Sequence, residues 1–230
     1  MKKLPDISFD LVVTSPPYNL NNSVGSGMKL GSRGSSKWSA TNTVRGGYNE
    51  HEDNMPHKEY VAWQRECLTE MLRLTKDTGA IFYNHKWRVQ SGQLQDRQDI
   101  VQGFPVRQII IWDRMSGFNF NPGYFLPTYE VIYLIAKPKF KLKTKANARG
   151  DVWQINFEQN TPHPAPFPTQ LVDIILNSCC GNRVLDPFLG SGTTAVSAKQ
   201  NGWDCVGIEK SKEYCDMATE RLLNTTTQLF

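Results

Sequence analysis

The chain has 230 residues, of which 39% are hydrophobic and 21% charged, a balance that indicates one globular domain and excludes a disordered chain. Its 26 Lys and Arg residues against 22 Asp and Glu residues give a formal net charge of +4, which permits a polyanionic partner without identifying one. No apolar run approaches the ~18 residues of a membrane span, and the N-terminal MKKLPDISFD lacks the apolar stretch of a signal peptide.

The cysteines and histidines show no pattern of a disulfide framework or a metal site. The five cysteines are odd in number and form no C-x-x-C pair, so we expect reduced, mostly buried thiols in a cytoplasmic protein. The four histidines are scattered without ligand spacing, and no metal is expected.

Strand and helix signals alternate along the chain, which predicts an α/β domain on a mostly parallel sheet. A first strand is expected at 11–14, followed by a mobile loop at about 21–54 that is rich in Gly, Ser and Asn. A helix is expected over 58–75, ended by Thr78-Gly79. The remaining expected elements are strands at 80–83, 106–112, 129–136, 183–185 and 204–208, and helices at 172–180, 194–201 and 212–223.

A glycine-rich loop, RVLDPFLGSGTT at 183–194, follows one of these strands. The strand ends at Asp186 and a helix begins near Thr193, so that glycines allow a ligand close to backbone N–H groups. No lysine precedes Thr193, which excludes a P-loop. Glu209 ends the next strand, roughly twenty residues on, where doubly wound folds place an acid for ribose hydroxyls. The loop predicts an adenosine-containing cofactor, and NAD stays open at this point.

The stretch DLVVTSPPYNL, at 10–20, stops a buried strand at a serine, two prolines and a tyrosine. Pro-Pro pairs also end strands as simple turns, so this segment alone does not establish a site.

Together, TSPPYN (14–19) and DPFLGSGTT (186–194) resemble the amino-methyltransferases of DNA, which use S-adenosylmethionine, in the motif order of their β-group. The resemblance covers nearly the whole chain, since it extends to Trp112-Asp113, Asn119 with Gly123, Tyr129-Glu130, Lys137, Asp151-Val152-Trp153 and HPAPFPTQLVD from His163. It implies a single methyltransferase domain over 1–230 with a Rossmann-like fold, in which helices cover both faces of a mostly parallel twisted sheet.

The chemistry of such enzymes assigns roles to the first motif. The exocyclic amine of a base is a poor nucleophile, and acceptors that hold its hydrogens stabilise the charge that develops on nitrogen. The resemblance implies that Ser15 Oγ and the Pro16 carbonyl are these acceptors, that Pro16 and Pro17 fix the backbone, and that Tyr18 stacks on an extruded base. No Pro-Cys pair is present for covalent attack on a pyrimidine ring.

The resemblance also implies the residues that hold the cofactor. The methionine end is expected against the glycine loop and the HPAPFP segment, and the ribose against Glu209, while Phe188 has ordinary core packing as an alternative role. The expected set is Asp186, Pro187, Phe188, Gly190, Gly192, Thr193, Pro164, Phe167, Thr169 and Glu209.

One expected strand is missing from the sequence. β-group relatives usually carry a strand ending in Gly-Asp before the catalytic motif, which lines the adenine side of the pocket, and this sequence starts just before the motif. We therefore expect the sheet to lack that strand, and either an open pocket, a homodimer or partner subunit that covers it, or a shortened chain.

Two segments are candidates for DNA contact. Lys139, Lys141 and Lys143 occupy alternate positions, which in an extended segment gives a one-sided cationic row suited to phosphates, although lysines also protect edge strands. We expect a short DNA-contacting segment at about 137–162, and Arg33 and Lys37 in the 21–54 loop as a second contact.

The identity of the methylated base rests on the motif residues. Ser15 in place of an aspartate, together with HPAPFP, favours the N4 amine of cytosine over the N6 amine of adenine. A bacterial or phage-encoded restriction-modification enzyme is expected, with an inactive DNA- or cofactor-binding homologue as the alternative from another class.

Overall fold

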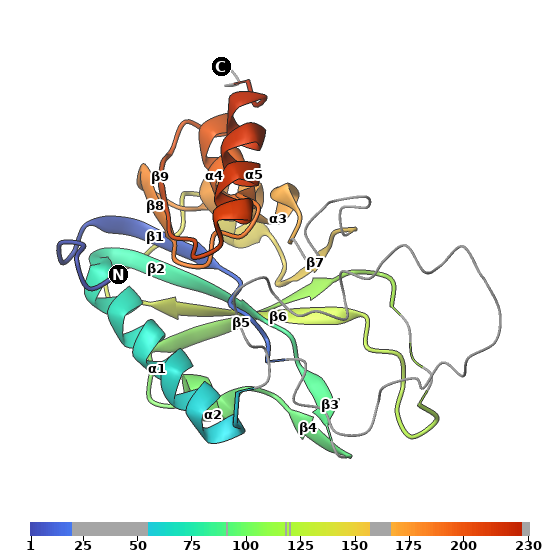
Figure 1. The fold of residues 1–230 in the computed structure, drawn as a ribbon. Coiled ribbons are helices and arrows are strands. Elements are labelled where there is room, and N and C mark those ends of the chain that lie inside the picture. The colour runs from blue at the N-terminus through green and yellow to red at the C-terminus, as the bar shows by residue number, and fades with distance from the viewer. Residues whose placement is uncertain (20–54, 91, 118, 120, 157–166, 227–230) are drawn as a thin grey trace.

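The computed structural model describes residues 1–19, 55–90, 92–117, 119, 121–156 and 167–226, and the predicted 21–54 loop lies outside them. A seven-stranded sheet in the order β7-β5-β6-β2-β1-β8-β9 forms the centre of the molecule (Figure 1). Its strands are β1 (Phe9–Thr14), β2 (Thr75–His85), β5 (Val106–Asp113), β6 (Tyr129–Ala136), β7 (Val152–Gln154), β8 (Arg183–Asp186) and β9 (Asp204–Gly207). The helices are α1 (His57–Leu74), α2 (Gln98–Val101), η4 (Ala146–Ala148), α3 (Thr169–Ser178), α4 (Thr193–Gln200) and α5 (Lys212–Leu223).

The direction of β6 differs from that of its neighbours. β1 is parallel to β2 and β8, β8 is parallel to β9, and β5 is parallel to β7, whereas β6 is antiparallel to β2 and β5. The expected mostly parallel, Rossmann-like sheet is therefore confirmed, with one reversed strand. Because of this reversal, β6 begins at the edge of the sheet where β1, β2 and β8 end.

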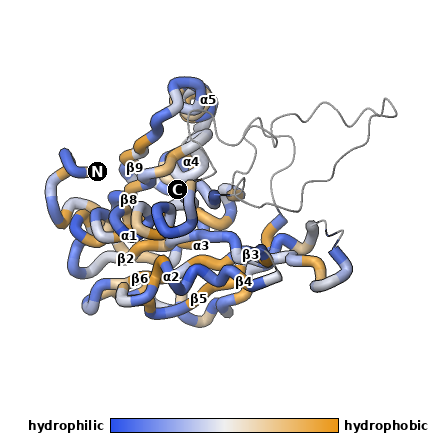
Figure 2. Tube along the Cα trace, turned by 60° about the horizontal axis from the view of Figure 1, so that its bottom comes forward, coloured by the Kyte–Doolittle hydropathy of each residue, from blue (hydrophilic) through white to orange (hydrophobic). Residues whose placement is uncertain are grey.

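Both faces of β1 are buried, as expected of a central strand in a sheet covered by helices on each side. Leu11 and Val13 belong to the core that includes α3, and Val12 belongs to the core under α1. Figure 1 shows α1 and α2 on one face and α3, α4 and α5 on the other, and Figure 2 shows hydrophobic residues along β2, β5 and β6 between these layers. No described helix is long and apolar enough to cross a membrane.

The end of α1 differs from the prediction. The helix stops at Leu74 and β2 starts at the next residue, so that Thr78-Gly79 lies inside the strand and ends nothing. Gly79 is required there because a Cβ atom would lie 2.4 Å from the carbonyl oxygen of Asp10 on β1. The glycine that indicated a break instead allows two strands to approach closely.

Five short elements were not predicted: α2, η4, β7 and the two strands of a hairpin, β3 (Arg88–Gln90) and β4 (Gln93–Gln95). Each helix or strand among them has three or four residues, which is too few to show a helical or alternating period.

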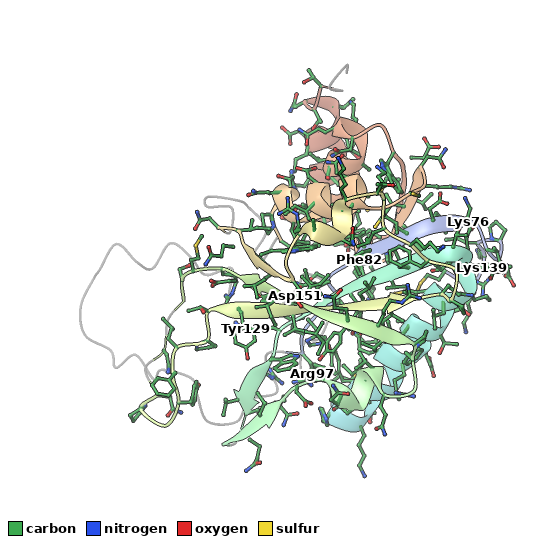
Figure 3. The ribbon with its side chains drawn as sticks, turned by 180° about the vertical axis from the view of Figure 1, so that it is seen from behind. Lys76, Phe82, Arg97, Tyr129, Lys139 and Asp151 are labelled. Carbon is green, nitrogen blue, oxygen red and sulfur yellow. The ribbon has the colours of Figure 1, made fainter. Side chains whose placement is uncertain are left out.

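The expected extended row of lysines is wrong. The chain turns after β6, Lys145 adopts a positive φ of 68°, and Phe140 is buried in the core. The Arg107 guanidinium donates to the carbonyl oxygens of Phe140 and Lys137 at 2.8 and 2.9 Å, and these bonds fold the segment back. Figure 3 shows Lys139 at the opposite end of the strands from Tyr129.

Candidate active site

Four chain segments meet at one edge of the sheet, where ligands bind in open α/β sheets. β1 leads out into Ser15–Tyr18, β2 ends in Asn84-His85, and β8 ends at Asp186. β6 enters at the same edge with Tyr129-Glu130, since Trp112 pairs with Glu130 and His85 with Val131.

A chain of hydrogen bonds runs from Ser15 to a buried carboxylate. The Tyr18 hydroxyl donates to Glu130 Oε2 at 2.9 Å, and it lies 2.6 Å from Ser15 Oγ. Because the single hydrogen of Tyr18 is directed at Glu130, Ser15 is the donor in the second bond. The Ser15 proton therefore points into the protein, and the Ser15 oxygen keeps a lone pair to accept a hydrogen besides its long contact with the Asn84 amide.

Asn84 stabilises this arrangement from β2. Its side-chain amide donates to Tyr18 Oη at 2.7 Å and to Glu130 Oε2 at 2.9 Å, with a longer contact of 3.3 Å to Ser15 Oγ. Among the described residues, neither its buried Oδ1 atom nor that of Asn19 has a hydrogen-bond partner.

The turn at Pro17 is held from below by two aromatic residues. The Tyr60 hydroxyl on α1 donates to the Pro17 carbonyl oxygen at 2.7 Å and lies 2.7 Å from His85 Nε2. The His85 ring stacks on Tyr18 with centroids 4.8 Å apart. Burial lowers the pKa of His85 to about 3, so this ring is neutral and acts as a packing surface.

Asp186 connects the glycine loop to β1. Its carboxylate accepts hydrogen bonds from Thr14 Oγ1 at 2.7 Å, Thr194 Oγ1 at 2.6 Å and the Phe188 amide at 3.1 Å. Burial raises the pKa of Asp186 to about 6, while these hydrogen bonds oppose the rise. Thr14, the residue before Ser15, is thus bonded directly to the glycine loop.

Glu209 shapes the same loop from the end of β9. One carboxylate oxygen accepts the Gly190 amide at 2.8 Å, and the other accepts the amides of Lys210 and Ser211 at 2.8 and 2.9 Å. A carboxylate has about four lone-pair sites, so this pattern leaves capacity for one further donor such as a ribose hydroxyl.

Gly192 is required for packing. It has φ of 87°, and a Cβ atom there would lie 2.7 Å from Ala218 Cβ on α5. Arg221, also on α5, donates to the Ser191 carbonyl oxygen at 2.8 Å and contacts Thr193 Oγ1 at 3.3 Å. The glycine loop is therefore held by α5 as well as by Asp186 and Glu209.

The other predicted cofactor residues lie around this loop in different settings. Pro187 is buried, whereas Phe188 is partly exposed and contacts Trp63 of α1 edge-on, with centroids 5.7 Å apart. Phe167 belongs to the core beside Leu171 of α3, and Thr169 is the first residue of that helix. Pro164, Arg33 and Lys37 lie outside the described residues.

The sequence motifs did not predict Asn84, His85, Tyr60 or Arg221 at the site. Glu130 was part of a motif match, but no role was predicted for it. Asn84 and His85 are polar residues that end an apolar strand, and Glu130 begins one, so their positions at strand ends were the available signal. Tyr60 and Arg221 lie on helices without any such signal.

Comparison with known proteins identifies the family of the chain. A family model described as DNA methylase, of the N6/N4 methyltransferase type, matches residues 9–220. The type II methyltransferase M.BglII of Bacillus subtilis is 28% identical over 261 residues, which cover 95% of this chain and 65% of the relative. M.ScaI of Streptomyces caespitosus is 25% identical over 274 residues, covering 100% of this chain and 80% of the relative. The chain thus spans about two thirds of M.BglII.

Solved structures show the same fold. The PvuII DNA methyltransferase, described as cytosine-N4-specific, superposes with a TM-score of 0.72 at 18% identity, over 99% of this chain and 84% of that one. A DNA modification methylase of Thermus thermophilus, TTHA0409, in complex with S-adenosyl-L-methionine, gives 0.65 at 23% identity, over 97% and 89%. Because the family model matches residues 9–220 of the 230, the chain belongs to the N6/N4 DNA methylase family.

Proposed function

We propose that the protein transfers a methyl group from S-adenosylmethionine to the exocyclic N4 amine of cytosine in DNA. The observation that carries the proposal is the pair of connections at the end of β1. Ser15 is linked through Tyr18 to Glu130, and the preceding Thr14 is bonded to Asp186 of the glycine loop. Ser15, the proposed acceptor of the amine, therefore directly follows the residue that is bonded to the loop proposed to hold the cofactor.

The residues at this edge fit S-adenosylmethionine. The partly exposed Phe188, the Gly190 turn and the remaining acceptor capacity of Glu209 suit its adenosine and ribose, and the ionised Asp186 suits its positive charge. When bound, this cofactor supplies an electrophilic methyl group on a sulfonium.

The chain's own residues then act on the base. Ser15 Oγ accepts one amine hydrogen, because its own proton is directed to Tyr18, and the Pro16 carbonyl oxygen is proposed to accept the other. Holding both hydrogens favours the pyramidal nitrogen of the transition state. After transfer, the nitrogen loses a proton, for which the hydrogen-bonded chain from Ser15 through Tyr18 to Glu130 offers a path.

The choice of cytosine rests on the motif resemblance. Ser15 stands where adenine enzymes usually carry an aspartate, and HPAPFP is closer to the cytosine-N4 form of its motif, although a neutral serine could accept a hydrogen from either amine. The adenine N6 amine is the alternative substrate, and loss of catalysis is the alternative from another class.

Nucleoside analysis tests the proposal. The purified chain is incubated with methyl-labelled cofactor and unmethylated genomic DNA, and the DNA is digested to nucleosides. N4-methylcytosine is the expected product. N6-methyladenine alone contradicts the choice of base, and cofactor binding without labelled DNA contradicts catalysis.

Contact of DNA with Lys139, Lys141 and Lys143 stays a prediction. Lys139 lies 3.8 Å from Asp77, and Lys143 contacts the Leu176 carbonyl oxygen at 3.5 Å, both away from the catalytic edge. If they bind phosphates, replacing all three with Ala reduces the slope of log Kd against log salt by about three. A homodimer or partner subunit over the cofactor pocket, and a cytoplasmic location, stay predictions as well.

A further inference from the structure

The loop that joins β5 to β6 carries exposed apolar side chains beside the candidate active site. It covers residues 114–128, all described except 118 and 120. Phe125 is 98% exposed, Met115 48% and Leu126 43%. Side chains so exposed contribute little to the stability of the fold, so their apolar character needs another reason.

The loop is braced by its own hydrogen bonds. The Arg114 amide donates to the Thr128 carbonyl oxygen at 2.8 Å, which closes the base, and the Asn119 side-chain amide donates to the Tyr124 carbonyl oxygen at 2.6 Å. The Gly123 amide donates to Asn121 Oδ1 at 2.8 Å just before the tip. Phe125 is therefore carried on a hydrogen-bonded backbone, which reduces the backbone entropy that would be lost when it inserts into a partner.

The base of the loop is continuous with the active site. The loop ends one residue before Tyr129, whose ring contacts Trp87 with centroids 6.2 Å apart, and two residues before Glu130, the acceptor of the Tyr18 hydrogen bond. Figure 3 shows Tyr129 at this edge of the sheet. The base of the loop therefore lies next to the hydrogen-bonded chain that includes Ser15.

Two cations at the base of the loop are directed at Glu130 and not at a partner. The Arg114 guanidinium is 3.9 Å from Glu130 Oε1 and donates to the Pro127 carbonyl oxygen at 2.9 Å. Burial lowers the pKa of Lys86, which follows His85 directly. The kind of partner is indicated by the DNA methylase family to which the chain belongs, since the stacked bases of a duplex accept an apolar side chain between them.

We propose that Phe125, with Leu126 beside it, is a wedge that enters the base stack of duplex DNA where the target nucleotide leaves. The inference rests on the proposed function, because base extrusion is needed only if Ser15 acts on a paired base. The wedge occupies the space of the extruded base and so opposes its return.

Substrates that differ only in pairing test the wedge. Once the methylated site is mapped on genomic DNA, it is placed in a duplex oligonucleotide, in the same strand alone, and in a duplex with an abasic residue opposite the target. Phe125→Ala is expected to lower kcat/KM on the duplex by roughly tenfold or more, and to leave the single strand within about twofold of wild type. The abasic duplex is expected to recover most of the loss, and Phe125→Trp most of the activity.

The controls distinguish a failure of the Phe125 wedge from a failure of the proposed methyltransferase function. Leu223→Ala removes a side chain that is 78% exposed at the end of α5 and is expected to have no effect on either substrate. The fluorescence of 2-aminopurine at the target position reports extrusion directly and is expected to fall with Phe125→Ala. Equal losses on duplex and single strand, or unchanged fluorescence and rate, overturn the wedge. A wild-type protein that methylates neither form contradicts the proposed function instead.

Discussion

Thr14 donates a hydrogen bond of 2.7 Å to the carboxylate of Asp186, although 172 residues separate them in the chain. Thr14 is the last residue of β1, and Asp186 is the last residue of the neighbouring β8. This bond connects the motif around Ser15 to the glycine loop, so a substitution that moves one of them is expected to move the other.

Ser15→Ala tests the acceptor. The substitution removes the hydroxyl that we propose to hold the amine, and by analogy with the loss of one transition-state hydrogen bond the methylation rate is expected to fall about 10²-fold. Cofactor affinity, measured by calorimetry, is expected to stay unchanged. Ser8→Ala, at the other end of β1, is the matched control and keeps full activity. Wild-type turnover by the Ser15 variant would remove the residue from the mechanism.

Glu130→Gln tests the end of the hydrogen-bonded chain. The amide keeps the size of the side chain but not its negative charge, so Tyr18 loses a charged acceptor and Ser15 loses its fixed orientation. We expect kcat to fall roughly tenfold to a hundredfold while KM for DNA changes little. Glu66→Gln, an exposed residue of α1, is the control. A rise in KM with an unchanged kcat would show that Glu130 serves binding only.

Asp186 gives the protein a pH dependence with a defined sign. Its pKa in the folded state is raised to about 6 from 3.8, so between these values the folded state holds the proton more tightly than the unfolded state. The contribution of Asp186 to stability therefore falls as pH rises through this window. Cofactor affinity is expected to change in the opposite direction and to strengthen as the carboxylate ionises near pH 6.

Asp186→Asn is expected to abolish both dependences and to weaken cofactor binding at neutral pH. For wild type and variant, calorimetric titrations from pH 4 to pH 8 measure the cofactor affinity, and thermal unfolding over the same range measures the stability. Parallel curves for wild type and variant would show that another group titrates.

Gly192→Ala tests the packing of α5 on the glycine loop. The new Cβ atom would meet Ala218 Cβ at 2.7 Å on a backbone with φ of 87°, so a loss of about 1–3 kcal/mol in the free energy of unfolding is expected. Gly150→Ala, where nothing lies within 4 Å of the added atom, is the control and is expected to be nearly neutral. Urea unfolding measures both, and equal midpoints would contradict the packing role.

Long elements with clear boundaries were predictable from the sequence. β6 and α5 match their predicted ranges, because β6 is apolar from Val131 onwards and α5 has a helical period behind a serine cap. The direction of β6 was not predictable, because the fifteen residues that precede it can form either a hairpin-like loop or a crossover.

The site was predictable only where the motif is local in sequence. Ser15 to Tyr18 and Asp186 to Thr193 stand together in the chain, whereas Tyr18 and Glu130 are 112 residues apart and Tyr18 and Asn84 are 66 apart. The prediction of an extended lysine row failed because alternating residues share one side only if the backbone is extended, and the bonds from Arg107 fold this backbone.

The reversal of β6 has a bearing on how the sequence can change. A parallel strand in that slot would deliver its first residues to the far rim of the molecule, and the acid would never reach Tyr18. Side chains alternate between faces along a strand, so deleting a single residue within 131–136 would displace Glu130 relative to its partners or turn it to the wrong face. Indels in the preceding loop leave that alignment untouched, although they would change where Phe125 lies.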